Sequence, residues 1–180
     1  MPITAEHIRK TLTEYTDAHP EEKATLSFVL EQLDQGADLT SRKTSPVHVT
    51  AGAVVVDESG HVLFIRHNAL RKYLTPGGHL EPEDTHLMGA ALRELTEETG
   101  IRASVVPLLP HPVHIDVHSI PANDAKGEPA HHHADVRWLF ATSGPVDVTL
   151  QAEEVSDVEW RSPDTLADET LRERVLSVIR

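Results

Sequence analysis

The chain has 180 residues, of which 29 are acidic and 16 basic, so its formal net charge at pH 7 is -13. This length suits one domain with a short appendage. The negative charge argues against nucleic-acid polymers and anionic membranes as partners, and an anionic small ligand would need a cation in its site. The sequence contains no cysteine, which excludes disulfides, thiolate metal ligands and a cysteine nucleophile. Residues 1–10 lack the apolar run of a signal peptide, and no stretch approaches the ~18 apolar residues of a membrane span, so we expect a soluble cytoplasmic protein.

The first 45 residues are predicted to form a helical hairpin. Apolar residues recur at helical spacing in residues 4–18 and again in residues 20–36, where a proline begins the second helix and a glycine ends it. We expect this hairpin to serve packing or dimerisation rather than catalysis. The predicted boundaries are therefore residues 1–45 for the extension and 46–180 for the main domain.

The rest of the chain intermingles strand-like and helix-like segments, which favours an α/β fold. A β-branched run, a turn-forming stretch with Asp57 and Gly60, and a second apolar run predict a β-hairpin. The predicted strands are residues 47–56, 62–65, 104–108, 113–118, 134–141 and 157–161, and the predicted helices are residues 87–99 and 163–179.

An acidic helix face is the main functional signal. Glu94, Glu97 and Glu98 stand at i, i+3 and i+4, so a helix brings the three carboxylates onto one face. Two unit charges about 5 Å apart repel by roughly 3 kcal/mol at an effective dielectric near 20, which a bound cation would relieve. Magnesium prefers oxygen ligands and often completes its shell with substrate phosphates, and manganese shares that preference.

Neighbouring residues also suit a metal site. Gly77 and Gly78 permit a tight backbone turn with an exposed carbonyl. Arg93 lies beside the acidic cluster, where its guanidinium can pair with a glutamate and hold its rotamer. An isolated E-x-x-E-E is usually a solvated helix face, but the combination with the glycine turn and the arginine favours a metal site.

Residues 77–101, GGHLEPEDTHLMGAALRELTEETGI, resemble the Nudix box, G-x5-E-x7-R-E-U-x-E-E-x-G-U, in which U is a bulky aliphatic residue. Residues 93–101 match the second half of this motif at every specified position. Counted from Gly78, Asp84 replaces the first motif glutamate, and the interval from Asp84 to Arg93 is one residue longer than in the family. The extra residue precedes the helix and leaves the carboxylate spacing intact. The role of Asp84 is open, with substrate contact as the candidate.

The resemblance implies a Nudix-type α/β/α sandwich with a mixed sheet, and a Mg2+- or Mn2+-dependent pyrophosphohydrolase. The substrate class implied is a nucleoside diphosphate linked to another moiety. By position, Gly77 would offer its carbonyl to metal, and Glu94, Glu97 and Glu98 would bind or bridge metals. Arg93 would orient a glutamate.

Many Nudix members also use an acidic residue from a late loop, and Glu154 is the choice in this chain. The catalytic set implied is therefore Arg93, Glu94, Glu97, Glu98 and Glu154. The resemblance leaves open whether Glu94, Glu98 or Glu154 takes the proton from the attacking water.

Two further functions fit the sequence less well. A non-catalytic Nudix-fold sensor of a nucleotide-like ligand could lose the metal carboxylates, yet this chain retains all three. Isopentenyl-diphosphate isomerase has a related fold, but its chemistry uses a cysteine that is missing here. Hydrolysis is therefore favoured, with the substrate undetermined among ADP-ribose, nucleotide sugars, dinucleoside polyphosphates and nucleoside triphosphates.

Histidines and carboxylates alternate along two predicted strands, which places each trio on one sheet face. A polar sheet face or a pH-sensitive patch is the plainest interpretation. The alternatives are substrate contact, for which His118, His131 and His133 are the candidates, and a dedicated metal site. The trios are His114, Asp116 and His118, and His131, His133 and Asp135.

Overall fold

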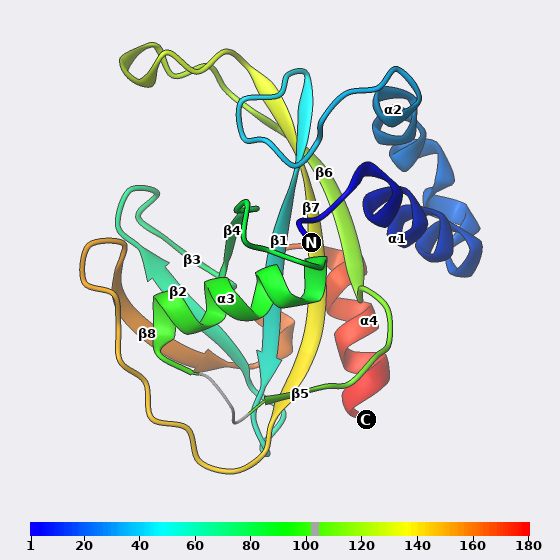
Figure 1. Cartoon of the computed structure of the whole chain (residues 1–180). Coiled ribbons are helices and arrows are strands. Elements are labelled where there is room, and N and C mark those ends of the chain that lie inside the picture. The colour runs from blue at the N-terminus through cyan, green and yellow to red at the C-terminus, as the bar shows by residue number, and fades with distance from the viewer. Residues whose placement is uncertain (102–104) are drawn as a thin grey trace. The chain divides into compact units, whose positions relative to one another are not determined.

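The computed structural model describes residues 1–101 and 105–180, and Figure 1 follows the chain from its N-terminus to its C-terminus. Within these residues no helix has the length and apolar character needed to cross a membrane. The helices and strands are α1 (Ala5–Ala18), α2 (Lys23–Asp34), β1 (Val47–Val56), β2 (Val62–His67), β3 (Lys72–Leu74), β4 (Gly77–His79), α3 (Leu87–Thr99), β5 (Val105–Pro107), β6 (His114–Ile120), β7 (His131–Thr142), β8 (Val155–Arg161) and α4 (Glu169–Ile179), with short 3-10 turns at Pro20–Glu22, Asp124–Lys126 and Pro163–Thr165.

The chain forms two compact units, each made of three segments. Unit 1 comprises Met1–Ala51, His79–Ala90 and Ile115–Val136, and unit 2 comprises Gly52–Gly78, Ala91–His114 and Arg137–Arg180. The histidines of β6 and β7 from His118 to His133 belong to unit 1, whereas the acidic face of α3 belongs to unit 2.

The strands hydrogen-bond in the order β3-β2-β1-β7-β5, with β4 also on β1, β6 on β7 and β8 on β2. The predicted hairpin of β1 and β2 is confirmed, because these strands pair antiparallel with Val56 opposite Val62. The carboxylate of Asp57 closes the turn by accepting hydrogen bonds from the N–H groups of Ser59 and His61, at 2.9 and 2.8 Å. The α/β class predicted from the sequence is therefore confirmed.

Helix α1 agrees closely with the predicted residues 4–18, whereas α2 (Lys23–Asp34) is shorter than the predicted residues 20–36, because Pro20–Glu22 form a separate 3-10 turn. Thr4 caps α1 by accepting a hydrogen bond of 3.1 Å from the N–H of His7. Ile8, Leu12 and Tyr15 form the buried stripe of α1, and the Tyr15 hydroxyl donates to the carboxylate of Glu22 at 2.7 Å. An apolar stripe with a polar cap at its start is enough to specify this helix.

The N-terminal helices also hydrogen-bond to later parts of unit 1. The N–H of Leu87, the first residue of α3, donates to Nε2 of His7 at 3.2 Å, and the N–H of Ile115 donates to the Tyr15 hydroxyl at 3.2 Å. Unit 1 thus includes the N-terminal helices together with segments from beyond residue 45. The predicted division into an extension of residues 1–45 and a main domain of residues 46–180 stays a prediction.

Unit 2 has an apolar core between its strands and α4. Its buried members come from β1, β2, β7, the segment before β6, and α4 with the residues that precede it. Burial of such a cluster is the main favourable term in folding the unit. The cluster comprises Val54, Val56, Val62, Phe64, Val113, Leu139, Leu166, Leu171 and Val175.

The last predicted helix, residues 163–179, is interrupted. Pro163–Thr165 form a 3-10 turn, Leu166 is extended with φ -61° and ψ 123°, and α4 begins only at Glu169. The carboxylate of Asp168 caps this second start by accepting from the N–H of Leu171 at 2.9 Å. Asp168 is a strong N-cap residue, and it therefore starts a separate helix.

Two short strands were not predicted, and one predicted strand is shorter than expected. The unpredicted β3 and β4 have three residues each. The structure gives the strand predicted at residues 104–108 as Val105–Pro107, and Ser104 lies outside the described residues.

Candidate active site

Helix α3 presents its acidic face because its opposite face is buried. Leu87, Ala91 and Leu95 have no exposed surface. The helix ends at Gly100, whose φ of 72° favours glycine, and a Cβ there would lie 3.2 Å from the carbonyl oxygen of Thr149. The register of the helix is thus fixed by an apolar stripe and a glycine stop.

The three glutamates of α3 differ in burial. Glu98 is only 3% exposed, and the side chains of Glu94 and Glu97 are 13% and 46% exposed. Arg93 connects the latter two, because its Nη1 lies 3.0 Å from Oε1 of Glu94 and 3.0 Å from Oε2 of Glu97. The predicted orienting role of Arg93 therefore has a geometric basis.

The glycine pair of β4, which the structure gives as a strand and not as the predicted tight turn, contacts two of these carboxylates. The N–H of Gly77 donates a hydrogen bond of 3.0 Å to Oε2 of Glu98. Gly78 lies against Glu94, since a Cβ on Gly78 would be 2.6 Å from Oε1 of Glu94. Because Gly78 has no side chain, the backbone of β4 can approach Glu94 this closely. Unit 2 thus brings Gly77, Gly78, Glu94 and Glu98 together.

Burial raises the pKa of both inner glutamates. The pKa of Glu94 rises to about 7, mainly through burial and against the opposing charge of Arg93. The pKa of Glu98 rises to about 8, again mainly through burial, although the hydrogen bond from Gly77 opposes this. Without a cation, the two carboxyl groups keep protons near neutral pH. A divalent cation would favour their charged forms, and the oxygen donors suit Mg2+ or Mn2+.

Glu154 lies in the loop before β8, and its charge contributes to raising the pKa of both Glu94 and Glu98. The N–H of Asn68 donates to the Glu154 carbonyl at 2.8 Å, and the Asn68 side chain donates to the carbonyls of Ala152 and Glu153, each at 3.2 Å. The loop that carries this predicted acidic residue is therefore fastened to the loop after β2.

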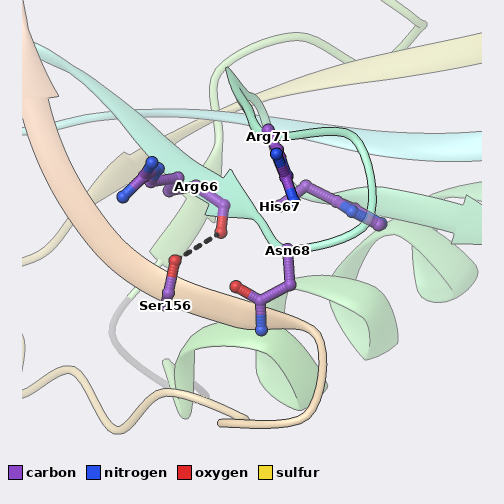
Figure 2. Close-up of a pocket in the computed structure, with 5 residues that line it drawn as sticks. All are labelled: Arg66, His67, Asn68, Arg71 and Ser156. Atoms are coloured by element: carbon purple, nitrogen blue, oxygen red, sulfur yellow. Dashed lines mark hydrogen bonds between the residues drawn. The ribbon is translucent and has the colours of Figure 1, made fainter.

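A basic pocket adjoins the same loop, and sequence reasoning missed it. Figure 2 shows Arg66, His67, Asn68, Arg71 and Ser156 around a hollow of about 290 Å³. Arg66 and Arg71 are exposed, and the carbonyl of Arg66 accepts from the Ser156 hydroxyl at 3.5 Å. The signal in the sequence was the cluster of basic residues between two apolar runs.

The candidate histidines gather in unit 1 with two others that were not predicted. Nε2 of His131 lies 3.3 Å from Nε2 of His133, and the rings of His118 and His133 are 5.7 Å apart. His48 from β1 stacks on His131 with ring centroids 4.9 Å apart, and His79 from β4 lies 5.1 Å from the ring of His133. The structure therefore gives a cluster of five imidazoles, defined here as His48, His79, His118, His131 and His133.

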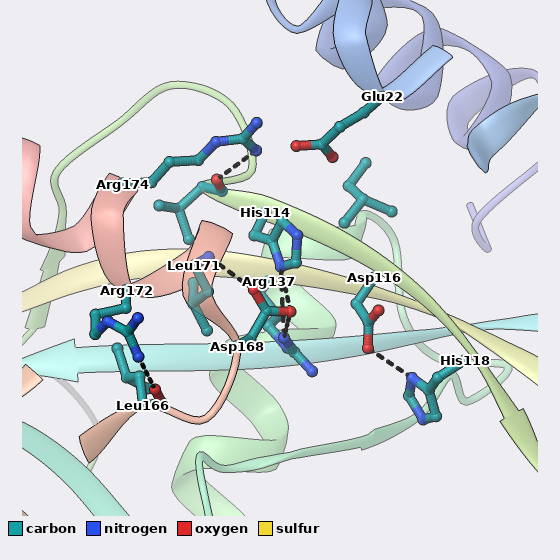
Figure 3. Close-up of polar contacts among 12 residues, drawn as sticks. Glu22, His114, Asp116, His118, Arg137, Leu166, Asp168, Leu171, Arg172 and Arg174 are labelled. Carbon is teal, nitrogen blue, oxygen red and sulfur yellow. Dashed lines mark hydrogen bonds and ion pairs between the residues drawn. The ribbon is translucent and has the colours of Figure 1, made fainter. Parts of the chain in front are cut away.

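The members of the two predicted trios have different contacts. Within the first, His118 Nδ1 pairs with the carboxylate of Asp116 at 2.8 Å, whereas His114 lies 3.6 Å from Asp168 (Figure 3). Within the second, the carboxylate of Asp135 accepts from the hydroxyl of Thr50 at 3.1 Å.

Two imidazoles of the cluster are uncharged at neutral pH. Burial, together with nearby cationic groups, lowers the pKa of His79 to about 4 and that of His133 to about 3. If His133 contacts a phosphate as predicted, it does so as a hydrogen-bond donor, because a neutral ring supplies no positive charge. The predicted substrate contacts of His118, His131 and His133 stay predictions.

Asp84 occupies a turn. It is 7% exposed, and its Oδ2 accepts a hydrogen bond of 2.8 Å from the N–H of Glu81. Its carbonyl accepts from the N–H of Ile3 at 2.9 Å. These contacts give Asp84 a structural role in unit 1, and its substrate contact stays a prediction.

Comparison with known proteins identifies the family. The NUDIX domain model matches residues 46–180. A probable DHNTP pyrophosphohydrolase of Lactococcus lactis subsp. cremoris (strain MG1363) is 31% identical over 136 residues, which cover 75% of this chain and 78% of that protein. The m7GpppN-mRNA hydrolase NUDT17 of Bos taurus is 34% identical over 101 residues, which span 53% of this chain but only 33% of that protein.

Solved structures show the same fold. An Ap4A hydrolase from C. elegans matches with a TM-score of 0.56 at 19% identity, covering 72% of this chain and 95% of the other. The predicted Nudix-type fold is therefore confirmed. The family model covers most of the chain. The chain belongs to the Nudix family and is a hydrolase of phosphorus-containing anhydrides.

Proposed function

We propose that the chain is a Mg2+- or Mn2+-dependent pyrophosphohydrolase that cleaves a phosphoanhydride bond in a nucleoside diphosphate linked to another moiety. The observation that carries the proposal is the buried carboxylate of Glu98 and the partly buried carboxylate of Glu94, both held beside the glycine pair of β4. Burying two acidic groups side by side is unfavourable in a purely structural role. A cation among them accounts for the arrangement.

The residues that would hold the ion are Glu94, Glu97, Glu98 and the carbonyl of Gly77. Each offers oxygen, the donor that Mg2+ and Mn2+ prefer. When bound, such an ion lowers the pKa of a coordinated water and stabilises negative charge on the departing bridging oxygen.

The protein's own groups position the reaction and move the proton. Arg93 fixes the rotamers of Glu94 and Glu97 through two hydrogen bonds of 3.0 Å. A glutamate accepts the proton of the attacking water, and Glu94, Glu98 and Glu154 are the three candidates. The pKa of Glu94, about 7 without metal, lies in the range suited to a general base at neutral pH.

We further propose that Arg66 and Arg71 contact the anionic part of the substrate. Both are exposed in the pocket of Figure 2, and that pocket is braced to the loop of Glu154 through Asn68. Guanidinium groups match phosphate oxygens in geometry and charge. The pocket thus supplies local positive charge in a chain whose formal net charge is -13.

The test is a hydrolysis panel with Mg2+ or Mn2+. The substrates are ADP-ribose, nucleotide sugars, dinucleoside polyphosphates, nucleoside triphosphates and DHNTP, the last suggested by the name of the Lactococcus relative. The Glu97→Gln variant is expected to lose metal-dependent turnover. Glu173→Gln, which alters an exposed glutamate of α4, is the matched control and should retain it. Absence of product from every substrate, with binding retained, would instead support a nucleotide-like ligand sensor.

The setting of the enzyme is a separate proposal. We propose a cytoplasmic enzyme acting on a small nucleotide-like diphosphate rather than on a nucleic-acid polymer, and possible homodimerisation through the N-terminal helices of residues 1–45. The net charge supports the choice of a small substrate. Light scattering of the full chain tests the dimer, and a monomeric full chain would contradict it.

A further inference from the structure

We propose that His48, His79 and His133 form a second metal site, made of imidazole nitrogens and suited to a divalent transition ion such as Zn2+. The site uses none of the carboxylates of α3, and all three of its ligands lie in unit 1.

The first support is the distance between the donor atoms. One ring nitrogen from each of the three histidines lies within 4.8 Å of the others. Nitrogens that bind the same Zn2+ at about 2.0–2.1 Å in tetrahedral geometry lie about 3.4 Å apart. A small inward rotation of the rings therefore closes the triad around an ion. His79 and His133 are only partly buried, which leaves their rings room for this adjustment.

The second support is the state of His48, which is 1% exposed. Its Nδ1 lies 3.0 Å from the carbonyl oxygen of Thr44, so Nδ1 carries the hydrogen and Nε2 keeps its lone pair. Among the described residues, Nε2 is buried and has no hydrogen-bond partner. A buried acceptor without a partner is costly, and a metal ion would satisfy it. Metal-binding histidines are commonly oriented in this way by a carbonyl on the opposite ring nitrogen.

His131 supplies a fourth imidazole and connects the triad to a pocket. Its Nδ1 lies 2.8 Å from the carbonyl of Pro129, which repeats the pattern of His48. Its Nε2 lies 3.3 Å from that of His133, which places its ring beside the proposed site. His131 also lines a pocket of about 350 Å³, together with Arg42 and Glu128.

The donor set decides the kind of metal. Three or four neutral imidazoles suit Zn2+, Co2+, Ni2+ and Cu2+, whereas Mg2+ requires oxygen ligands. No carboxylate belongs to the triad. The histidine site and the proposed carboxylate site therefore differ in metal preference, and excess Mg2+ can be used to separate them.

The experiment titrates the metal-free full chain with Zn2+ in excess Mg2+, by calorimetry. We expect one tight equivalent in the wild type. Loss of an outer-shell partner alone weakens metal binding by about 10–100-fold, so His79→Gln and His133→Gln should weaken it by at least about 100-fold. His132→Gln is the matched control. His132 neighbours His133 on β7, but its ring contacts Phe28, with centroids 5.5 Å apart. The Zn2+ affinity of His132→Gln should equal that of the wild type.

A second pair of measurements keeps the test independent of hydrolysis and of variant folding. Glu97→Gln should keep full Zn2+ affinity even if it abolishes turnover, so failure of the proposed hydrolysis would leave this result intact. Co2+ bound to the wild type should show the intense visible absorption of four-coordinate nitrogen ligation. The proposal would be overturned if folded His133→Gln kept the Zn2+ affinity of the wild type, or if Glu97→Gln lost it. A weak Co2+ spectrum typical of six-coordinate binding would also overturn it. Phosphate binding that depends on His133 without any Zn2+ binding would assign the cluster to substrate instead.

Discussion

The N–H of Gly77 donates a hydrogen bond of 3.0 Å to Oε2 of Glu98, a residue 21 positions later in the chain. This contact connects β4 to the acidic face of α3. It also opposes the effect of burial on the pKa of Glu98, because it stabilises the charged carboxylate. The family resemblance assigns the carbonyl of Gly77 to metal, and the structure adds a role for its N–H.

Replacing Gly78 by alanine should impair catalysis more than folding. The added Cβ would meet Oε1 of Glu94 at 2.6 Å, and this contact is with the movable end of a side chain. Glu94 would therefore be displaced while the backbone stays in place. A catalytic group shifted by about 1 Å can cost about 10²-fold in rate. Steady-state kinetics measures the loss, and a thermal melt close to that of the wild type is the accompanying expectation. A collapse of the melt with normal specific activity would contradict it.

The metal-free protein should become less stable as the pH rises, through its inner glutamates. The pKa values of Glu94 and Glu98 in the folded state, about 7 and about 8, lie above the ordinary value of 4.5. The folded state thus binds more protons, and the stability present below pH 4.5 is lost as the pH rises through about 8. Urea unfolding in EDTA between about pH 6.5 and 8.5 should give a steeper decline for the wild type than for Glu98→Gln.

Histidines do not confound that comparison. The pKa values of His79 and His133 are lowered from 6.5 to about 4 and about 3, and their linkage is common to the wild type and Glu98→Gln, so it cancels from the difference between the two profiles. For these two histidines the unfolded state binds more protons, and stability falls as the pH drops through about 6.5. Added Mg2+ should restore more stability at the alkaline end than at the acidic end. Parallel pH profiles for the wild type and Glu98→Gln would count against buried, proton-binding glutamates.

Removing the guanidinium of Arg66 or Arg71 should raise KM more than it lowers kcat. A hydrogen bond between a charged group and a phosphate contributes about 1.5–3 kcal/mol, which corresponds to roughly 10–150-fold in KM. Arg71 has a φ of 52°, so Arg71→Asn is preferable to alanine because asparagine tolerates that backbone conformation. The control is Arg9→Ala, which removes an exposed ion pair with Asp34 in α2. If the variants of Arg66 and Arg71 had the same KM as Arg9→Ala, the substrate would bind away from this pocket.

Asp168 should be a stability residue of unit 2. Figure 3 shows its carboxylate beside His114 and Arg137, at 3.6 and 3.7 Å, and it also caps α4. Asp168→Ala should lower the free energy of unfolding by about 1–2 kcal/mol, chiefly through the lost cap. Asp168→Asn keeps a capping oxygen and should recover most of that loss. Urea unfolding measures both, and equal effects of the two variants would show that the charge matters more than the cap.

Local signals predicted the long elements well. The bounds of β1 and α3 agree with the prediction to the residue, because β-branched runs and helical spacing end at clear turn formers. The strands β3 and β4 escaped prediction because three residues carry little pattern. The sequence of β4, Gly-Gly-His, is a poor strand former, and this strand exists through its pairing with β1.

For the candidate site too, local spacing predicted some features and the tertiary structure was needed for others. Helical spacing alone predicted that Glu94, Glu97 and Glu98 share a face. The contact of Gly77 with Glu98 needed the tertiary structure. His48 lies within an apolar strand and His79 follows a glycine pair, so neither had the alternation that drew attention to His131 and His133. Their convergence depends on strand neighbours far apart in the sequence.

The turn closed by Asp84 affects which changes of length the connection before α3 can tolerate. Its carboxylate accepts from the N–H of Glu81 at 2.8 Å, and its own N–H returns a bond of 3.0 Å to the Glu81 carbonyl. The connection that carries the extra residue thus folds back on itself before α3 begins. Insertions and deletions can accumulate in such a turn while the intervals between the helix glutamates stay constant. A strict motif search that fixes the length of this connection would therefore overlook active relatives.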